Sequence, residues 1–206
     1  DTLGQVITDS GVLDGAAGGT LSTAEIGRGL KEALQNGITK GANQLSLKDG
    51  FYKSIYKILL PEEVQTVTKR LKNVPGFTNL EEQLLQKINE GAEDAAKEAA
   101  PIFINAIKSM TFNDALNILM GKDNAATEFL QRTTTEQLYN SFNPKITNSL
   151  NKIGAADIWK SAATTYNGLP LISKKVNPDL SDHVTTQALK GLFSKVAEEE
   201  KNIRRN

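Results

Sequence analysis

Signals that start a helix recur along the chain from residue 22 onward, and they constrain its fold more than any other feature. Residues 22–25 read Ser-Thr-Ala-Glu, a capping box in which the serine side chain accepts a hydrogen bond from the amide three residues later and the glutamate bonds back. Residues 78–81 and 133–136 repeat this arrangement, and residues 111–114 carry a version with aspartate. Pro61 precedes two glutamates, a combination typical of the first turn of a helix. The chain is therefore predicted to be built from helices.

The spacing of apolar residues agrees with these signals. Leu80, Leu84 and Ile88 lie four residues apart, and residues 189–196 carry apolar groups at similar helical intervals. No stretch alternates long enough to be a clear strand, and residues 52–60 fit either a short strand or a loop. We predict an all-α fold, a single-domain irregular bundle of about eight helices without an extensive sheet. The expected helices span residues 22–45, 61–74, 79–100, 101–110, 112–120, 124–132, 134–153 with a break at Asn143-Pro144, 156–167 and 181–204.

Composition excludes several classes of function. The 206 residues hold 24 basic and 24 acidic side chains, so the formal charge is zero and the basic surface typical of nucleic-acid binding is not expected. The lack of cysteine excludes disulfides, thiolate metal sites and cysteine nucleophiles. No apolar run approaches the roughly 20 residues of a membrane-spanning helix. Residues 1–21, rich in Gly, Asp and Ser, are predicted to form a flexible lead-in or tether to one helical domain over residues 22–206.

The segment Met120–Thr134 contains a Gly-Lys pair and so raises the question of a phosphate-binding loop. Such a loop needs a strand, the pattern GxxxxGK followed by Ser or Thr, and then a helix. Here the preceding residues have a helical period, and Lys122 is followed by Asp123, which would repel phosphate. We interpret the segment as a turn in which Gly121 ends one helix in a left-handed conformation and Asp123 or Asn124 caps the next.

Small residues line one face of the first long helix. An interior glycine costs a helix about 1 kcal/mol relative to alanine, so a row of them needs an offsetting gain. Such a row lets another helix approach closely, and a tight crossing with the alanine-rich run at 91–100 is predicted. Two alternatives remain. The glycines leave room for a ligand, or the row is exposed and two copies of the chain form a homodimer through it. The row consists of Gly29, Ala33, Gly37 and Gly41.

Pro101 follows the alanine-rich run. Proline lacks an amide hydrogen and disfavours helical geometry in the residue before it. The helix is therefore predicted to kink or break at Pro101, and the same property underlies the break expected at Pro144.

Few polar residues are candidates for chemistry. His183 is the only histidine, so a Ser-His-Asp triad or a histidine-containing metal site would have to use it, but its position near a helix start favours a capping or surface role. Four acids line neighbouring turns of one predicted helix, yet no Glu-x-x-His motif occurs and Lys97 among them indicates surface ion pairing. No catalytic, cofactor-binding or metal-binding residue is predicted. The four acids are Glu90, Glu93, Asp94 and Glu98.

Aromatic residues gather in two places. They make up only 6% of the chain, so they are expected either to anchor the core or to form the rim of one groove. The core role is the simpler interpretation. The candidates for a groove are Tyr52, Tyr56, Trp159 and Tyr166.

The C-terminal segment AEEEKNIRRN places acidic residues before basic ones. Glu200 and Arg204 are four residues apart, in the order that favours an ion pair on a helix. Glu199 continues the apolar stripe of the same helix, which places an acid at the edge of the core. The segment is predicted either to be a solvated terminal helix or to pair with residues elsewhere or with a further tail. Glu200 and Arg204 are candidates for contacting a partner.

Several long stretches follow one another in order: GLKEAL at 29–34, DGFY at 49–52, LPEE at 60–63, FINAIKSMTFNDALNIL at 103–119, NPDLSDHVTTQALKGLF at 177–193 and AEEEKNIRRN at 197–206. Together they resemble a bacterial family of unknown function, the one numbered 4197, over nearly the whole chain from about residue 22. The resemblance implies an exported, periplasmic all-helical protein, often a lipoprotein, with a membrane tether through a lipid upstream of Asp1. It also implies a tail beyond the final Arg-Arg-Asn, and it implies no activity.

Two functional hypotheses follow. The first is a cell-envelope helical protein that acts as a non-enzymatic binding module for a protein or small ligand held in a groove. The second is a carboxylate- or metal-dependent hydrolase of unknown substrate, which the single histidine and the lack of a recognised motif disfavour. No cofactor is predicted, and the charge balance argues against nucleic acid as a partner.

Overall fold

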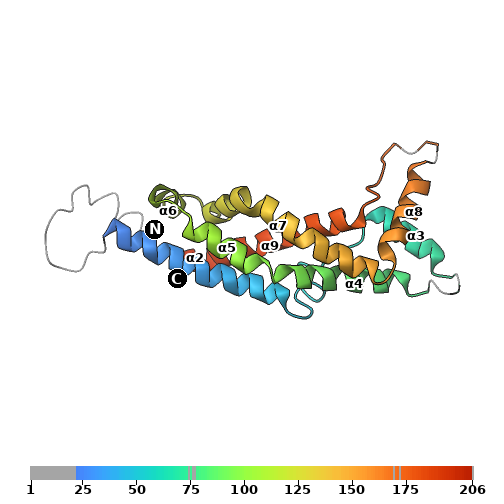
Figure 1. The fold of residues 1–206 in the computed structure, drawn as a ribbon, viewed down its shortest axis with the longest axis horizontal. Coiled ribbons are helices and arrows are strands. Elements are labelled where there is room, and N and C mark those ends of the chain that lie inside the picture. Colours follow the sequence, from blue (N-terminus) through green and yellow to red (C-terminus); the bar gives the residue numbers. More distant parts are fainter. Residues whose placement is uncertain (1–21, 74, 76–77, 169, 172, 206) are drawn as a thin grey trace.

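The computed structural model describes residues 22–73, 75, 78–168, 170–171 and 173–205, so the predicted lead-in at 1–21 lies outside the described residues. Every regular element in the described ranges is an α-helix, which confirms the all-α prediction (Figure 1). The helices are α2 (Thr23–Ser46), α3 (Glu62–Leu71), α4 (Leu80–Ala96), α5 (Ala99–Lys108), α6 (Phe112–Leu119), α7 (Ala125–Asn151), α8 (Ala155–Asn167) and α9 (Leu180–Arg205).

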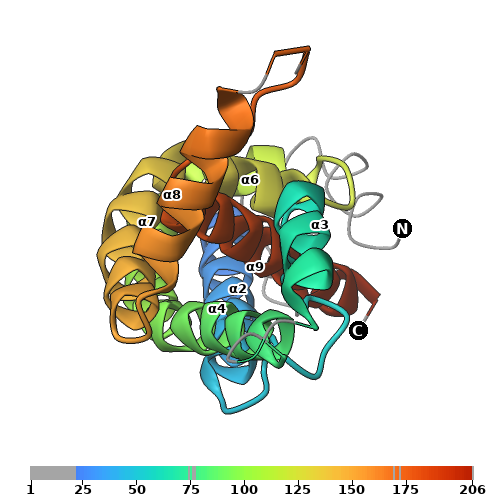
Figure 2. The ribbon, with the colours of Figure 1, turned by 90° about the vertical axis from the view of Figure 1, so that its right-hand side faces the viewer.

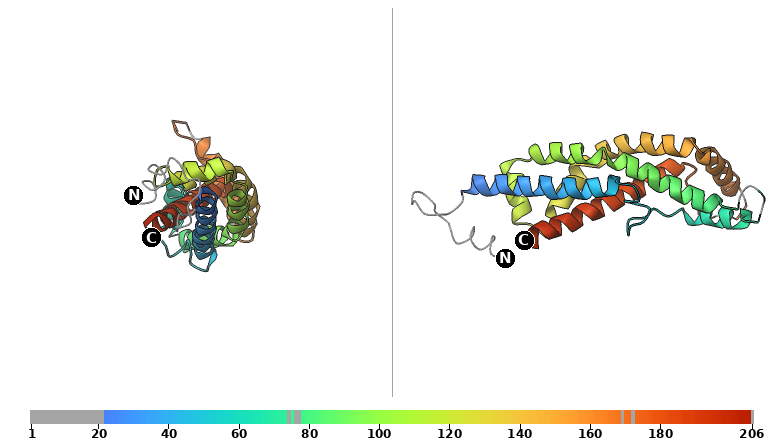
Figure 3. Two further views of the ribbon diagram at one scale, coloured as in Figure 1. Left: turned by 90° about the vertical axis from the view of Figure 1, so that its left-hand side faces the viewer. Right: turned by 90° about the horizontal axis from the view of Figure 1, so that it is seen from below.

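The helices form an elongated bundle. α2, α7 and α9 run along its length together with α4 and α5, which follow one another along the same side (Figure 1, Figure 3). α3 and α8 lie at one end of the bundle, and α6 lies towards the other end (Figure 1, Figure 2). One cluster of buried apolar side chains joins these helices, and Phe51, Phe103 and Phe142 are the largest of its fully buried members.

Two of the predicted capping boxes form, and they begin α2 and α6. The Glu25 amide donates to Ser22 Oγ at 3.3 Å, and the Ser22 amide donates to the Glu25 carboxylate at 2.7 Å. Thr111 and Asp114 make the same reciprocal pair. The capping box predicted at 78–81 is wrong. α4 begins without a side-chain cap, because the residue before it does not have the extended backbone of a capping residue.

α7 is one helix of 27 residues, and the predicted break at Asn143-Pro144 is wrong. Phe142 and Ile146, on either side of the proline, are both fully buried. Burial of this continuous stripe outweighs a proline that costs a helix about 3 kcal/mol. Pro144 itself is exposed, and so is Asn140, whose carbonyl loses its helical partner to the proline and is left to water.

The capping box predicted at 133–136 is also wrong, because these residues lie inside α7. The hydroxyls of Thr133, Thr134 and Thr135 donate to carbonyls one turn earlier, at 2.9, 2.6 and 2.6 Å respectively. This back-bonding satisfies a threonine hydroxyl within an uninterrupted helix, so the threonines that suggested a helix start are compatible with a helix interior.

The predicted interruption near Pro101 exists, but it lies three to four residues earlier. α4 ends at Ala96 and α5 begins at Ala99, which puts Pro101 in the first turn of α5. A proline ring clashes with the carbonyl four residues before it, here that of Lys97, and the chain leaves the helix at that residue. The proline thus begins the second helix rather than kinking the first.

The glycine row of α2 packs closely against a helix, but the predicted partner is wrong. A Cβ placed on Gly37 would lie 2.8 Å from Ile203 Cδ1, and one on Gly41 would lie 2.9 Å from Glu199 Cγ, so the row meets α9. Gly29 has no neighbour within 4 Å of such a Cβ and takes no part. The alanines of 91–100 that are buried belong to the common core instead.

Candidate functional site

The connection between α2 and α3, residues 47–61, consists of turns and an irregular stretch rather than a strand. A buried carboxylate of α4 holds its first half. Glu93 Oε1 accepts hydrogen bonds from the amides of Phe51 and Tyr52 at 3.1 and 3.0 Å, and the Phe51 ring is fully buried beside them. Burial raises the pKa of the Glu93 carboxyl above its usual value, although main-chain hydrogen bonds act in the opposite direction.

A buried amide of α4 holds the second half of the connection. Asn89 Oδ1 accepts from the Ile58 amide at 2.8 Å, and Asn89 Nδ2 donates to the Ile58 carbonyl at 3.0 Å. Asn89 is completely buried. Its side chain therefore satisfies both main-chain groups of Ile58, as a neighbouring strand would. Together with Glu93 it fixes a segment that has no secondary structure of its own.

Two large aliphatic side chains of this connection point outward. Ile55 is 89% exposed and Leu59 is 60% exposed, although the main chain between them is anchored to the core. Both side chains border a groove of about 490 Å³ whose other wall is α9. That volume lies within the roughly 300–1,000 Å³ typical of ligand sites.

Gly191 on α9 allows the connection between α2 and α3 to pack closely against this helix. A Cβ at this position would lie 3.0 Å from Phe51 Cε1 and 3.4 Å from Tyr56 Cβ. A side chain here would push the connection away from α9. The floor of the groove therefore depends on a glycine in the middle of a long helix.

The groove carries polar groups with an excess of positive charge. His183 Nε2 lies 3.2 Å from the Leu59 carbonyl oxygen, which can only accept, so this nitrogen bears the proton of the hydrogen bond. Lys57 and Lys190 line the groove, and neither forms an ion pair within the described part of the chain. Glu62 is the acid among the lining residues.

The predicted aromatic candidates whose side chains the structure describes do not share one groove. Tyr56 lines the groove and donates to Glu198 at 2.6 Å, and burial together with this bond raises the pKa of the Tyr56 hydroxyl strongly. Tyr52 donates to Glu82. Trp159 is buried and donates to a main-chain carbonyl in the α8–α9 connection at 3.0 Å. The side chain of Tyr166 lies outside the described residues.

Glu200 is buried and caps α7 from the opposite end of the chain. Its carboxylate accepts from the amides of Ala126 and Thr127 at 2.9 and 2.8 Å and from the Thr127 hydroxyl at 2.7 Å. Arg204 Nη2 lies 2.8 Å from the same carboxylate and also donates to the Ile118 carbonyl at 2.8 Å. The terminal segment is thus not merely solvated. It pairs with residues elsewhere, and it joins α6, α7 and α9.

This arrangement answers the question raised by the Gly-Lys pair. The α7 amides that a phosphate would need are occupied by the chain's own carboxylate, so the segment is a turn. The left-handed conformation predicted for Gly121 is wrong, because the described glycine with a positive φ is Gly154. Gly121 is instead required by space, since a Cβ would lie 2.6 Å from the Asn117 carbonyl. Asn124 precedes α7 but makes no side-chain cap.

The four acids considered as metal ligands do not converge. Glu93 points inward to the connection between α2 and α3, and the other three pair with lysines. Within the described residues, no group of three or more His, Asp or Glu side chains is placed to hold a metal ion. The lysine pairs are Lys87–Glu90 at 2.6 Å, Lys97–Asp94 at 3.0 Å and Lys145–Glu98 at 3.2 Å.

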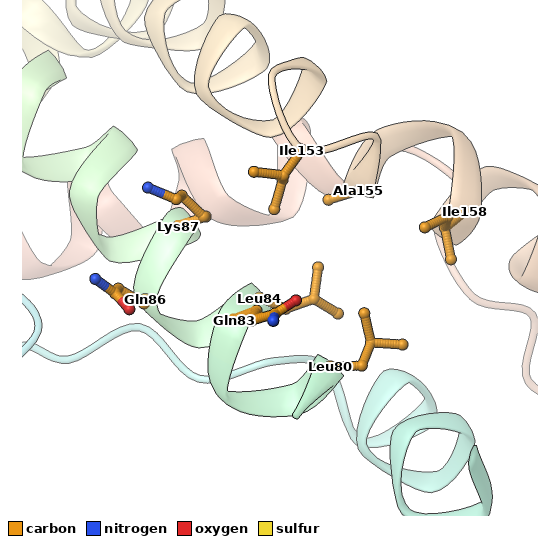
Figure 4. A pocket seen from close by; sticks show the side chains of 8 residues that line it. All are labelled: Leu80, Gln83, Leu84, Gln86, Lys87, Ile153, Ala155 and Ile158. Carbon is orange, nitrogen blue, oxygen red and sulfur yellow. The ribbon is translucent and has the colours of Figure 1, made fainter. Parts of the chain in front are cut away.

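A second, smaller pocket lies where α4 faces the start of α8. Figure 4 shows Leu80, Leu84, Ile153 and Ile158 pointing towards one another across it. Its volume is about 150 Å³, below the range typical of ligand sites. It is best described as a gap between helices that is lined by aliphatic groups.

Comparison with known proteins places the chain in a family. The family model described as "Protein of unknown function (DUF4197)" matches residues 20–206, which is nearly the whole chain. The chain belongs to this family. The resemblance seen in the sequence is thereby confirmed. Because the family is described as one of unknown function, membership in it gives the chain no activity. Searches of curated proteins and of solved structures found no match.

Sequence reasoning about this DUF4197 chain missed the residues that shape the groove. The sequence pattern does not single out Asn89, and it indicates Glu93 only as a surface acid or a metal ligand. The apolar neighbours of both residues at helical spacing were a usable signal, because a polar residue on a predicted buried face needs a partner.

Among the helices that the structure describes, none combines the length and hydrophobicity of a membrane-spanning segment.

Proposed function

We propose that this protein is a non-enzymatic interaction module of the cell envelope, and that it binds a short segment of a partner protein in the groove between residues 55–61 and α9. Its location in the periplasm, with a lipid tether upstream of Asp1, is part of the proposal and draws on the family resemblance described for the sequence. The site itself rests on geometry.

The observation that carries the proposal is the fixed exposure of Ile55 and Leu59. Single exposed aliphatic residues are common on protein surfaces. Here, however, two of them border one groove. The backbone that carries them is held in place by hydrogen bonds from main-chain amides to Glu93 and Asn89. Preorganised apolar groups beside a concave surface reduce the ordering cost of binding, which suits a docking site.

The alternative function, a carboxylate- or metal-dependent hydrolase, gains no comparable support from the described residues. Main-chain amides donate to Oε1 of the buried Glu93 and to both carboxylate oxygens of the buried Glu200. Such carboxylates are committed to structure, and neither borders the groove. A binding role therefore accounts for the arrangement better than catalysis does.

The proposal can be tested by selecting random nine-residue peptides on phage against the immobilised protein. Gln187 lines the groove on α9, and Gln187→Trp should fill it. We expect selected peptides to lose at least about tenfold in affinity for this variant. Gln131→Trp, at an exposed position on α7, is the matched control and should bind as the wild type does. A selection that yields no peptides, or peptides insensitive to Gln187→Trp, would refute the binding site.

The proposed location needs a separate test. Expression of the full-length gene in a bacterium, followed by fractionation, should place the protein in the periplasmic or membrane fraction. Recovery from the cytoplasm would contradict an envelope role without bearing on the groove.

A further inference from the structure

The main chain at residues 57–60 has the character of an exposed strand edge. These residues are neither helix nor turn, and Pro61 biases the residue before it towards an extended conformation. The N–H and C=O of Ile58 both point to Asn89. The Leu59 carbonyl instead faces His183 on α9, as expected for successive residues of an extended chain, and the Lys57 amide closes a turn by donating to the Ser54 carbonyl at 3.2 Å.

The outward main-chain groups are only partly used. Within the described residues the Leu59 amide has no hydrogen-bond partner, and neither has the Lys57 carbonyl. The Leu59 carbonyl accepts one hydrogen bond, from His183, and retains a second lone pair. An added strand would find a donor and two acceptors along this edge, next to the groove.

The side chains around this edge indicate what such a strand carries. Ile55 and Leu59 offer exposed aliphatic surface for apolar residues. Lys57 and Lys190 are opposed by Glu62 alone among the charged residues that line the groove, so the groove has an excess of positive charge. A ligand with a carboxylate would complement it.

We propose that the groove binds an extended peptide segment bearing both apolar and acidic residues, which pairs through its main chain with Lys57 and Leu59 as an added strand. This inference rests on the proposed function and specifies the conformation and chemistry of the ligand. It differs from helix-in-groove binding, which would leave the Leu59 amide unpaired.

A pair of substitutions separates main-chain pairing from side-chain contact. Leu59→Ala removes the aliphatic group and keeps the amide, whereas Leu59→Pro removes both. Because this amide has no partner among the described residues, proline breaks no described hydrogen bond there. The probe is the tightest peptide from the phage selection, labelled with fluorescein and measured by fluorescence polarisation. We expect Leu59→Pro to lose about fivefold to tenfold more affinity than Leu59→Ala.

Peptide chemistry supplies a second measurement on the wild-type protein, which remains informative if Leu59→Pro does not fold. N-methylation of single peptide amides should abolish binding at alternate positions, because only every second amide of an added strand faces the edge. Equal affinity for Leu59→Ala and Leu59→Pro, together with tolerance of N-methylation at every position, would overturn the strand model. Binding would still be lost in Gln187→Trp, so the proposed function would survive that outcome.

The attraction between the lysines of the groove and an acidic peptide is tested separately, with its own control variant. Lys190→Gln should weaken binding of the same peptide by about threefold to tenfold at low salt, and Lys40→Gln, at an exposed position on α2, should not. Selected peptides without Asp or Glu would refute the acidic ligand. Binding to phosphatidylglycerol vesicles that persists in Leu59→Pro, with no peptide binding, would assign this edge to a lipid surface and overturn the proposal.

Discussion

Glu93 and Glu200 perform the same task at two places in the bundle. Each is a buried carboxylate that accepts hydrogen bonds from two consecutive amides of a distant segment. They differ in their other partners. Glu200 also binds the guanidinium of Arg204, whereas Glu93 has no cation partner within the described residues and its pKa is raised by burial.

The difference separates a structural joint from a support for a candidate binding surface. The charge at Glu200 is compensated, and the joint fastens the ends of α6 and α7 to α9. Glu93 instead holds an irregular connection whose outer side borders the groove. Because no cation compensates the buried Glu93 carboxylate, this second attachment is expected to be the weaker of the two.

The largest effect is expected from Glu200→Ala. This change leaves the α7 amides uncapped and the Arg204 guanidinium without its partner, so the free energy of unfolding should fall by about 3–5 kcal/mol. Urea denaturation followed by circular dichroism measures it. Glu136→Ala, at an exposed position on α7, should change stability by less than about 0.5 kcal/mol. A loss below about 1 kcal/mol for Glu200→Ala would show that the joint is not structural.

Glu93→Ala should come next, with a loss of about 2–4 kcal/mol, because two main-chain amides, one buried and one partly buried, lose their acceptor. The change should also be local. Hydrogen exchange at the Phe51 and Tyr52 amides should accelerate more than exchange in α7, and peptide binding to the groove should weaken. Unchanged exchange at these two amides would contradict the role given to Glu93.

Arg204→Gln should cost about 1–3 kcal/mol, because it removes the charge-assisted bonds to Glu200 and to the Ile118 carbonyl. Arg205→Gln is the matched control, since this neighbouring arginine is exposed. The double variant Glu200→Gln/Arg204→Gln should recover part of the loss, because the amide oxygen of the neutral side chain can still accept from one of the two α7 amides. Strict additivity in this double-mutant cycle would mean that Glu200 and Arg204 are not coupled.

The smallest and most specific effect concerns pH. A carboxyl whose pKa is raised in the folded protein contributes stability that is present below its unfolded pKa, about 4.3, and lost as pH rises through the folded value. Glu93→Gln removes this dependence and keeps an acceptor oxygen. The stability of the variant relative to wild type should therefore rise as pH increases from about 4 to 7.

Glu90→Gln provides a control of opposite sign. The hydrogen bond from Lys87 lowers the pKa of the Glu90 carboxyl, so its contribution is present at neutral pH and lost as pH falls through the folded value. Thermal unfolding measured across the same pH series would compare the two variants. Parallel curves for Glu90→Gln and Glu93→Gln would contradict the assignment for Glu93.

The sequence predicted the helices well because their signals are local. The boxes at Ser22–Glu25 and Thr111–Asp114 close between residues three apart, and they form. The same reasoning failed at 133–136 and at Pro144, where burial along α7 overrode the local preference. The candidate groove was predicted only through Tyr56, because the residues that shape it are brought together from α4, α9 and the connection between α2 and α3.

By itself, then, the sequence determined the all-α fold, most helix positions and the family. Only the tertiary structure decided that the Gly37 and Gly41 face meets α9 rather than the alanine run, and that Glu93 and Glu200 bind amides 41–42 and 73–74 residues away. Helix caps and apolar periodicity depend on neighbours within one turn, whereas the choice of packing partner depends on all the surfaces that compete for the same core.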